Sequence, residues 1–399
     1  MERTLWAENF VDSFSSRPLT AECVFHSPQY IDRGKQKEVC DLLFILRGNA
    51  ILVSMKSQDN PSSRTGDKLR RWTIKNSTRA LNQAKGALNT LGRERFWCDH
   101  SRRGRVDFEP SSIRVAHIVV LTEVLGDTVD LPNDLPLLLG DVPVTYLSVN
   151  DFLNLINELR AFPDITEYLD ARRALPHENL RMVGHEVPFY KYYILNGESF
   201  HGCEGYADAR IASATRDVEW QEVLTKGQSR HRFAGLVEHV SDALATRLTN
   251  FSEGLDAQTV ARFDSANDRK HYLLMQEELC DLRLAERTAV GEYFTKAIDK
   301  NGTDEGMTYA AFFTDSKPDL VYVLVSAKGV DRPILLCRLT ILVRAAMATY
   351  GKERGLVIAD RDKDGFEVQL ISGSFTDPAD KKLGETYFAR LRMSHVPIE

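Results

Sequence analysis

The sequence predicts an α/β protein with two domains. Its 399 residues exceed the usual size of one domain, and 43% hydrophobic with 27% charged residues is an ordinary globular balance. Continuous apolar strands separated by a helical segment predict a mixed sheet, covered on both faces, in the first half. We place the domains at 1–175 and 176–399, because helical patterning gives way near 175–190. The second domain is expected to be α+β with a helical first part.

Local patterns predict the elements of the first half. Apolar residues at helical spacing predict a short amphipathic helix over 4–16. Two β-rich apolar runs flank Arg47-Gly48-Asn49, which is a strong hairpin signal. A helix over about 70–91 ends before Gly92. The other expected elements are a strand at 21–26, a polar stretch at 30–38, a basic polar loop at 93–112, strands at 114–122 and 143–149, and a helix beginning at a capping Asn150 or Asp151.

The second half is predicted to contain helices followed by a smaller α/β unit. Residues 206–225 and 229–300 are expected to be mainly helical. The later expected elements are a hairpin of 307–313 and 319–328, a helix that ends at Gly351, and strands at 355–360 and 366–372.

Composition and terminal patterns exclude several classes. The six cysteines are scattered without a Cys-x-x-Cys pair, so a disulfide scaffold or a structural zinc site is not expected. The start of the chain lacks the basic and apolar regions of a signal peptide. No apolar run approaches the ~20 residues of a membrane helix. We therefore expect a cytoplasmic protein without a membrane partner.

Positive charge is concentrated in one segment. Residues 56–105 hold thirteen Lys or Arg against four acidic residues, a net of +9 in a chain whose net charge is −6. Such a local basic block favours an anionic partner. Trp72, Phe96 and Trp97 lie among these charges and can stack on bases. The nucleic-acid-binding candidates are Arg64, Lys68, Arg70, Arg71, Lys75, Arg79, Gln83, Arg102, Arg103 and Arg105.

The first hairpin brings candidate catalytic residues together. Asp41 opens its first strand and Lys56 ends its second, so antiparallel pairing places both at one edge of the sheet. Glu38 lies three residues before Asp41, and Glu8 lies on the first helix. Carboxylates bind hard cations such as Mg²⁺, which polarise a phosphodiester and activate water. A nearby lysine stabilises the charge that builds on the phosphate.

This arrangement resembles the PD-(D/E)XK, or restriction-endonuclease-like, nuclease superfamily. The resemblance is carried by Glu8, by Asp41 within EVCDLLFIL, by Lys56 within ILVSMKSQ, and by a helix with Gln83 that is similar to the one in NERD domains. It covers about residues 1–165 and implies a core of helix, hairpin, helix and strand. It also implies phosphodiester hydrolysis that depends on Mg²⁺ (or Mn²⁺), with Asp41 and the backbone carbonyl of Met55 on the metal.

One position departs from the family pattern. The family has Asp or Glu two residues before the lysine, where this chain has Ser54. The loss of that carboxylate weakens metal binding and raises the question of catalytic competence. Glu8 and Glu38 are candidates to fill the gap as metal ligands. Gln58 is a further candidate, because side chains at 54, 56 and 58 share one face of an extended strand.

A second Ser-x-Lys segment occurs late in the chain. VLVSAKG at 323–329 is similar to ILVSMKS at 51–57, and both follow a turn and a strand. The position thirteen before Ser326 is Phe313, where the first segment has Asp41. The second segment is therefore expected to lack the metal acid and to serve binding or dimerisation if it has a role.

The sequence thus predicts a metal-dependent endonuclease acting on DNA, and the resemblance implies a place in phage defence. The second domain is expected to provide homodimerisation, regulation or recognition of a protein partner. One alternative is a nuclease-like fold that has lost catalysis at Ser54 and only binds nucleic acid. The other is an interaction protein whose basic block docks on an acidic partner.

Overall fold

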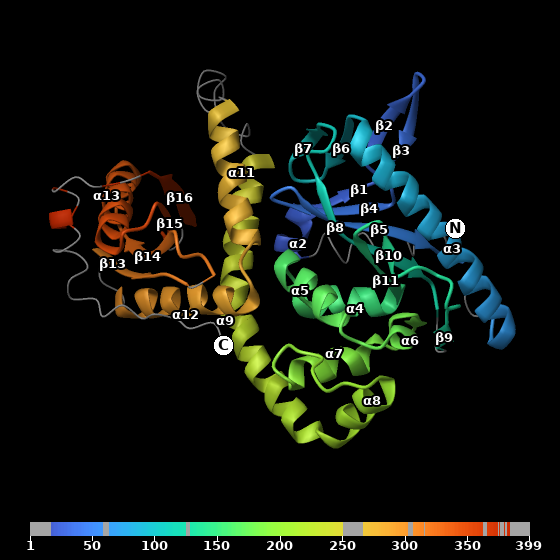
Figure 1. Ribbon diagram of the computed structural model, residues 1–399. Coiled ribbons are helices and arrows are strands. Elements are labelled where there is room, and N and C mark those ends of the chain that lie inside the picture. The colour runs from blue at the N-terminus through green and yellow to red at the C-terminus, as the bar shows by residue number, and fades with distance from the viewer. Residues whose placement is uncertain are drawn as a thin grey trace. The chain divides into compact units, whose positions relative to one another are not determined.

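The computed structural model describes residues 17–58, 64–124, 128–249, 266–301, 306–314, 316–361, 365–373, 375, 379 and 381–383. The chain forms two compact units, Met1–Lys226 and Gly227–Glu399 (Figure 1). The first unit extends beyond the predicted division at 175/176, so residues 176–226 belong with it. The α/β class is confirmed, because both units contain mixed sheets with helices. The helix predicted at 4–16, with Glu8, lies outside the described residues.

The first unit is built on a six-stranded sheet with the order β1-β4-β5-β8-β11-β10. β4 runs antiparallel to β1 and β5, whereas β5, β8 and β11 are parallel. The carboxyl ends of these three strands therefore meet at one edge, where Thr122 pairs with both Lys56 and Ser148. The strands are β1 (Val24–His26), β4 (Leu42–Leu46), β5 (Asn49–Lys56), β8 (Arg114–Thr122), β10 (Leu138–Leu139) and β11 (Val142–Ser148).

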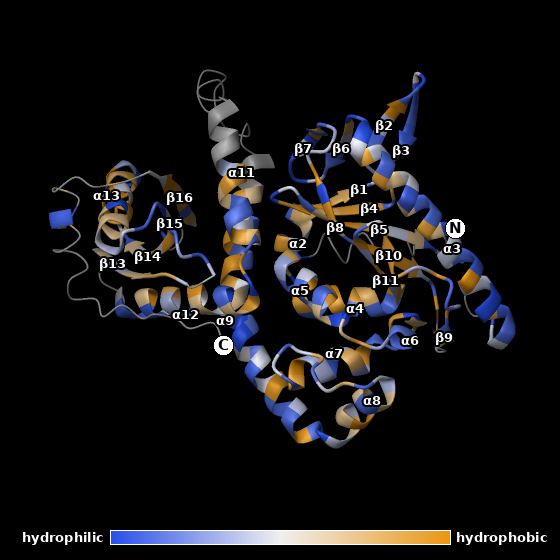
Figure 2. Cartoon of the chain, viewed as in Figure 1, coloured by the Kyte–Doolittle hydropathy of each residue, from blue (hydrophilic) through white to orange (hydrophobic). Residues whose placement is uncertain are grey.

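The predicted hairpin is confirmed as β4 and β5. Arg47 and Gly48 connect them with φ values of 50° and 75°. Positive φ at both central residues defines the tight turn whose twist matches that of the strands. The side chains of these strands are almost all buried, in agreement with their continuous apolar sequence. Figure 2 shows this concentration of apolar residues in the central sheet.

Helices cover both faces of this sheet. α3 (Gly66–Arg93) packs on one face through Leu69, Ala80, Ala84 and Leu91, and it is longer than predicted. α4 (Val149–Leu159) lies on the other face, where Phe152 contacts Phe44 with 6.1 Å between ring centroids. Its N-cap is Ser148, two or three residues before the predicted caps. The remaining helices of this unit are α2 (Pro18–Cys23), α5 (Phe162–Arg172), α6 (His177–Leu180), α7 (Glu186–Leu195) and α8 (Tyr206–Thr215), and α9 (Asp217–Thr249) begins in it.

A small antiparallel sheet replaces two segments that were predicted to be irregular. Its order is β3-β2-β6-β7, and its strands come from the polar stretch at 30–38 and the basic loop at 93–112. The prediction of loops was wrong because β2, β3 and β7 are largely exposed and polar, which hides the strand periodicity. The strands are β2 (Gln29–Asp32), β3 (Lys35–Glu38), β6 (Phe96–His100) and β7 (Gly104–Phe108), and a separate pair consists of β9 (Val129–Asp130) and β12 (Met182–Val183).

The second unit has a four-stranded sheet with the order β13-β14-β15-β16. β13 and β14 form the second predicted hairpin, β14 and β15 are parallel, and β16 is antiparallel to β15. The described elements are the rest of α9, α11 (Ala266–Cys280), α12 (Leu284–Asn301), β13 (Gly306–Phe312), β14 (Leu320–Lys328), α13 (Arg332–Tyr350), β15 (Arg354–Asp360) and β16 (Phe366–Ser372).

α13 is the most apolar helix of this unit. It ends at Gly351, whose φ of 61° is the left-handed conformation expected of a C-cap glycine. By length and composition it is the one described helix that could cross a membrane. Its buried residues Leu335, Leu339 and Val343 pack on the alternate residues of β14 and β15, so the sheet accounts for much of its apolar character.

Candidate functional site

Asp41 is anchored at the edge of the central sheet. It lies one residue before β4, and because Leu42 pairs with Val53, Asp41 stands opposite Ser54. Its Oδ2 accepts a hydrogen bond from the Met55 backbone N–H at 2.7 Å and lies 3.3 Å from the Ser54 hydroxyl, which donates to it. β5 continues beyond the start of β4 at this point, so the Met55 N–H has no backbone acceptor on β4. The Asp41 carboxylate accepts this N–H instead. The carboxylate is therefore fixed by the backbone of β5.

The Met55 carbonyl faces the same side as this carboxylate. The carbonyl of Lys56 accepts from the backbone N–H of Glu123, toward β8. Successive carbonyls in a strand point to opposite sides, so that of Met55 points away from β8. The N–H of Met55, which donates to Asp41, has the same direction.

A pocket of about 250 Å³ opens beside Asp41. Its walls come from the small sheet, the segment just before β4, the end of β5 and the C-terminal half of α3. The Ser54 hydroxyl also lies 3.4 Å from Oε1 of Gln83 and can donate to it. The structure thus brings together four predicted residues, and the pocket is lined by Tyr30, Glu38, Val39, Cys40, Asp41, Ser54, Gln83, Gly86, Ala87 and Thr90.

Electrostatics couple Glu38 to its predicted neighbours. Burial raises the pKa of Glu38, and the charge of Asp41 raises it further. A hydrogen bond from Ser27 and the positive charge of Lys56 oppose this shift of the Glu38 pKa. The two carboxylates repel each other, and a bound cation would relieve that repulsion.

Gln58 does not join this pocket. β5 ends at Lys56, and the Gln58 side chain donates to the carbonyl of Glu123 at 2.8 Å and accepts from Arg64 at 2.6 Å. The expected shared face with Ser54 is not formed, because β5 ends at Lys56 and the Gln58 side chain is bonded to Glu123 and Arg64. Glu123 is the residue that sequence reasoning missed. It is 5% exposed, burial raises its pKa, and its carboxylate accepts from the Gln58 N–H at 2.7 Å.

The donor set beside Asp41 suits a hard cation. Asp41, Glu38 and the Met55 carbonyl offer oxygen ligands, and Ser54 and Gln83 add further oxygens. Mg²⁺ is commonly held by one or two carboxylates together with waters and substrate phosphates. The described part of the chain contains no group of three His, Cys, Asp or Glu side chains that could hold a metal. A two-carboxylate Mg²⁺ site fits these residues, and Glu8 lies outside the described part.

The basic candidates divide into two groups. Lys68, Arg71, Lys75 and Arg79 are exposed and recur every three or four residues, so they form one row along α3. The row spans roughly 16 Å at the 1.5 Å rise per helical residue. The same spacing continues to Gly86 and Thr90 in the pocket. Arg70 is exposed on another side of the helix, and Arg64 lies over the Trp72 ring at 5.7 Å.

The candidates on the small sheet are more strongly engaged. Arg102 and Arg103 form ion pairs with the buried Glu22 at 3.4 and 3.1 Å. Both arginines therefore neutralise the charge of the Glu22 carboxylate, which is 0% exposed. Arg105 is exposed and lies over the Trp97 ring at 4.6 Å.

The second Ser-x-Lys segment has a different orientation. Ser326 pairs with Thr308, so Thr308 and not Phe313 occupies the place of Asp41, because this hairpin has a longer loop. In β5, Leu52 belongs to the core beneath α3, and Ser54 shares its face. In β14, Val325 and Ala327 belong to the core beneath α13, so Ser326 and Lys328 lie on the opposite face. The similarity of the two segments does not extend to their sites.

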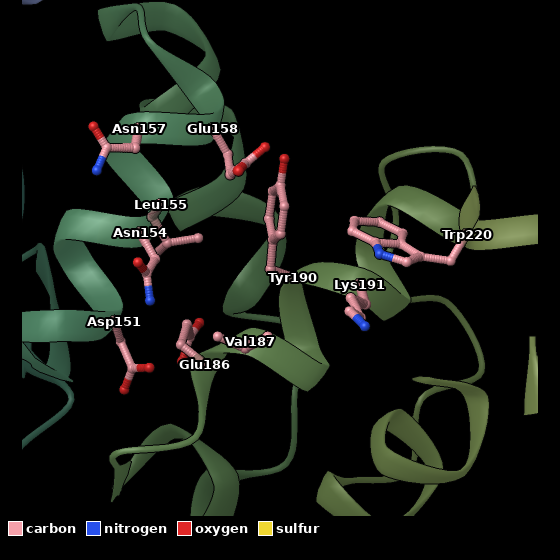
Figure 3. Close-up of a pocket in the computed structure, with 10 residues that line it drawn as sticks. All are labelled: Asp151, Asn154, Leu155, Asn157, Glu158, Glu186, Val187, Tyr190, Lys191 and Trp220. Atoms are coloured by element: carbon pink, nitrogen blue, oxygen red, sulfur yellow. The ribbon is translucent and has the colours of Figure 1, made fainter. Parts of the chain in front are cut away.

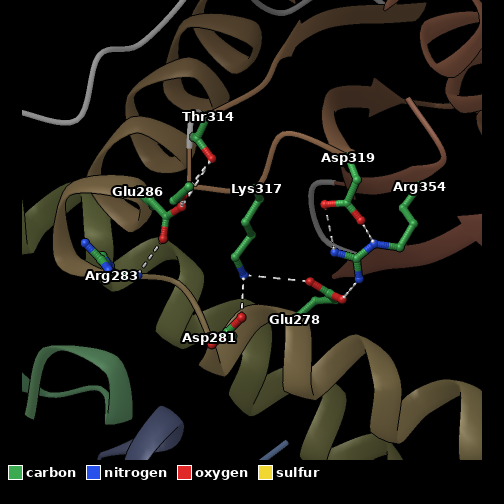
Figure 4. Close-up of polar contacts among 9 residues, drawn as sticks. Glu278, Asp281, Arg283, Glu286, Thr314, Lys317, Asp319 and Arg354 are labelled. Atoms are coloured by element: carbon green, nitrogen blue, oxygen red, sulfur yellow. Dashed lines mark hydrogen bonds and ion pairs between the residues drawn. The ribbon is translucent and has the colours of Figure 1, made fainter. Parts of the chain in front are cut away.

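Two further features stand out among the described residues. A second cavity of about 250 Å³ lies between α4, α7 and the start of α9 (Figure 3). In the second unit, a buried polar network joins the α11–α12 turn to the start of β14 and β15 (Figure 4). There Lys317 lies 3.0 Å from Asp281 and 3.7 Å from Glu278, and Arg354 pairs with Glu278 and Asp319. The positive and negative side chains of this network pair with one another, as is typical of ion pairs that stabilise a fold.

Comparison of the chain with family models, curated proteins and solved structures found no match.

Proposed function

We propose that the first unit is a metal-dependent endonuclease that hydrolyses phosphodiester bonds of DNA. The observation that carries the proposal is the pocket in which Asp41, fixed by the Met55 N–H, lies with Glu38, Ser54 and Gln83 at the end of the strand that Lys56 closes. The hairpin, helix and parallel strand that surround it follow the order implied by the nuclease resemblance.

Each residue has a role that its position supports. Asp41 and Glu38 would hold Mg²⁺ with the Met55 carbonyl, and Mg²⁺ would polarise the phosphodiester and lower the pKa of a bound water. Lys56 supplies positive charge beside Glu38, where it can stabilise the negative charge that develops on the phosphate. Ser54 lies beside the Asp41 oxygen that accepts the Met55 N–H, and Gln83 lies beside Ser54, so both belong to the wall around this carboxylate.

The row of cations on α3 would bind the phosphate backbone. Lys68, Lys75 and Arg79 lie on the flank of α3 that leads to Gly86 in the pocket. Such contacts position a nucleic acid without reading its sequence. Binding should weaken with salt, and Lys75→Ala should reduce the slope of log affinity against log salt by about 1. An affinity that does not change with salt would contradict this part.

Cleavage assays with matched variants test the proposal. Linear, circular and single-stranded DNA, and RNA, are incubated with the protein in Mg²⁺ and in Mn²⁺. We expect Asp41→Asn and Lys56→Ala to lose cleavage by at least a hundredfold, an effect of about 2.7 kcal/mol. Lys328→Ala is the control, because it removes the lysine of the other Ser-x-Lys segment. Cleavage that survives both site variants would overturn the assignment of the site.

A binding protein without catalysis is the second candidate function. Ser54 favours it, because the family acid is missing and the described residues offer two carboxylates at the pocket. This candidate predicts DNA binding without cleavage and without a metal-binding heat signal. The nuclease proposal also includes a cytoplasmic location and homodimerisation, which rest on the sequence, and a place in phage defence, which rests on the family resemblance.

A further inference from the structure

The second cavity has an acidic wall and an aromatic wall. α4 contributes Asp151, Leu155 and Glu158 to one side, and α7 and α9 contribute Tyr190 and Trp220 to the other (Figure 3). The two rings are nearly perpendicular, at 85° with 6.5 Å between centroids. The complete lining is Asp151, Asn154, Leu155, Asn157, Glu158, Glu186, Val187, Tyr190, Lys191 and Trp220.

Asp151 is a buried carboxylate at the base of this cavity. It is 7% exposed, and its Oδ2 accepts from the Ser148 hydroxyl at 2.7 Å while Ser148 accepts its backbone N–H. This capping pair fixes the direction of the carboxylate. Among the described residues no cation lies within ion-pair distance of Asp151. The nearby Arg172 places its guanidinium on Glu186, at 2.6 and 2.9 Å. Buried charges are normally paired, so Asp151 suits a cationic ligand.

The opposite end of the cavity is also negative. Glu158 lines this end of the cavity with Tyr190. Burial raises the pKa of Tyr190, and the negative charges of Glu158, Asp164 and Glu198 raise it further. Lys191 is the one cation in the lining, and its ammonium lies over the Trp220 ring at 5.1 Å. The aromatic wall therefore already binds one alkylammonium group, that of Lys191. The acidic residues of the lining outnumber this cation, so the cavity can bind further ammonium groups.

The spacing of the acids indicates the shape of the ligand. Asp151 and Glu158 are seven residues apart on one face of α4, or about 10 Å along the helix axis. Leu155 lies between them, and Tyr190 faces them. Helix positions this far apart do not form the close pair of carboxylates typical of a site for one metal ion. They match a linear chain with a positive group toward each end and methylenes between.

We propose that this cavity binds a linear aliphatic polyamine. Its ammonium groups would lie near Asp151 and near Glu158 with the Tyr190 hydroxyl, and its methylenes would cover Leu155 and the Tyr190 ring. The proposal is independent of the nuclease assignment, since it involves none of the residues beside Asp41.

Calorimetric titration of the full chain, free of nucleic acid, tests this site. Spermidine is the probe, propylamine is the single-charge comparison, and Mg²⁺ is the inorganic comparison. We expect saturable 1:1 binding of spermidine, with propylamine and Mg²⁺ at least tenfold weaker. Glu158→Gln and Asp151→Asn should each weaken spermidine binding about tenfold, and both keep side-chain volume and hydrogen-bonding capacity.

Glu222→Gln is the matched control, because Glu222 is an exposed acid on α9 outside the cavity. It should leave spermidine affinity unchanged, and thermal unfolding followed by circular dichroism should show that all three variants fold. The absence of saturable spermidine binding would overturn the proposal. An equal loss of affinity in Glu158→Gln and Glu222→Gln would also overturn it, because it would report only the overall charge.

Discussion

The Asp41 carboxylate accepts the backbone N–H of Met55 at 2.7 Å, and this bond ties the first acid of the site to the second strand of the hairpin. The bond holds only one carboxylate oxygen. Oδ1 makes no hydrogen bond to the described residues and stays available to a metal. The position that the nuclease resemblance assigns to a second acid is Ser54, whose hydroxyl lies 3.3 Å from the same Oδ2.

Restoring the acid at this position should couple stability to metal. In Ser54→Asp, two carboxylates would lie together in a site that is 1% exposed at Ser54, so the metal-free variant should be less stable than the wild type. Mn²⁺ should reverse this loss, since tenfold tighter binding adds about 1.4 kcal/mol at saturating metal. Melting temperatures with and without Mn²⁺ measure the effect. Ser54→Asn is the neutral control, and equal metal responses of the two variants would contradict the proposed site.

Substitutions at Gly86 should affect stability and function in opposite directions. It lies inside α3 and lines the pocket, and an added Cβ would meet nothing within 4 Å. Glycine in a helix interior costs up to about 1 kcal/mol relative to alanine, and packing gives no reason for it here. We expect Gly86→Ala to raise the melting temperature, and Gly86→Leu to reduce cleavage or nucleic-acid affinity at least tenfold by filling the pocket.

Gly92 provides the comparison for Gly86. It also lies in α3 with nothing within 4 Å of an added Cβ, and it is outside the pocket. Its Ala and Leu variants should therefore leave nucleic-acid affinity and cleavage unchanged. If both positions respond alike in the functional assay, the pocket does not hold the substrate.

His100 should make the first unit sensitive to acid. Its Nδ1 accepts the backbone N–H groups of Arg102 and Arg103, each at 3.1 Å, and burial lowers its pKa to about 3. The unfolded chain protonates this histidine near pH 6.5, so between about pH 6.5 and 3 the unfolded state binds the additional proton. The free energy of unfolding should be highest above pH 6.5. It should decrease as the pH is lowered from 6.5 to 3, by up to about 1.4 kcal/mol per pH unit.

Denaturant unfolding as a function of pH measures this dependence. His100→Asn retains a hydrogen-bond acceptor and should flatten the slope between pH 6.5 and 3. His201→Asn is the control, because His201 is exposed. A slope that both substitutions leave unchanged would show that other groups dominate the acid response.

The sequence predicted those parts of the fold that depend on local chemistry. The hairpin was visible because Gly48 stands between two apolar runs, and Gly351 marked the end of α13. The hairpin placed Asp41 and Lys56 at one edge of the sheet, whereas the register that sets Asp41 opposite Ser54 came from the structure. The pocket follows from that register and from Gln83 on the next helix.

Long-range pairing explains what was missed. β2 pairs with β6 through Tyr30 and Phe96, which are sixty-six residues apart, and a pairing between such distant segments cannot be inferred from local patterns. The face occupied by Ser326 depends on which alternate residues of β14 lie beneath α13, which a similar heptapeptide cannot reveal. Glu123 directly follows β8, and Gln58 follows β5. Their contact could be inferred only once the parallel pairing of β5 with β8 was known.

The compact first unit ends at Lys226 and not near residue 175, and a buried ion pair joins the parts on either side of residue 175. Arg172 is 1% exposed, and Glu186 receives its guanidinium at 2.6 and 2.9 Å together with the Tyr168 hydroxyl at 2.6 Å. Val183 also completes the small β9–β12 pair. Residues 176–226 thus satisfy polar groups that belong to the first unit.

Two truncations should therefore behave differently. A chain of residues 1–226 should unfold cooperatively, because it retains Glu186 and Val183. A chain of residues 1–175 leaves the Arg172 guanidinium buried without its partner, and removing one member of a buried ion pair costs about 3–5 kcal/mol. That loss is a large share of typical domain stability, so this chain should be unfolded or molten by near-UV circular dichroism. Arg172→Met in the 1–175 chain removes the unpaired charge and should recover part of the stability. Equal and cooperative unfolding of both truncated chains would show that residues 176–226 are dispensable for the first unit.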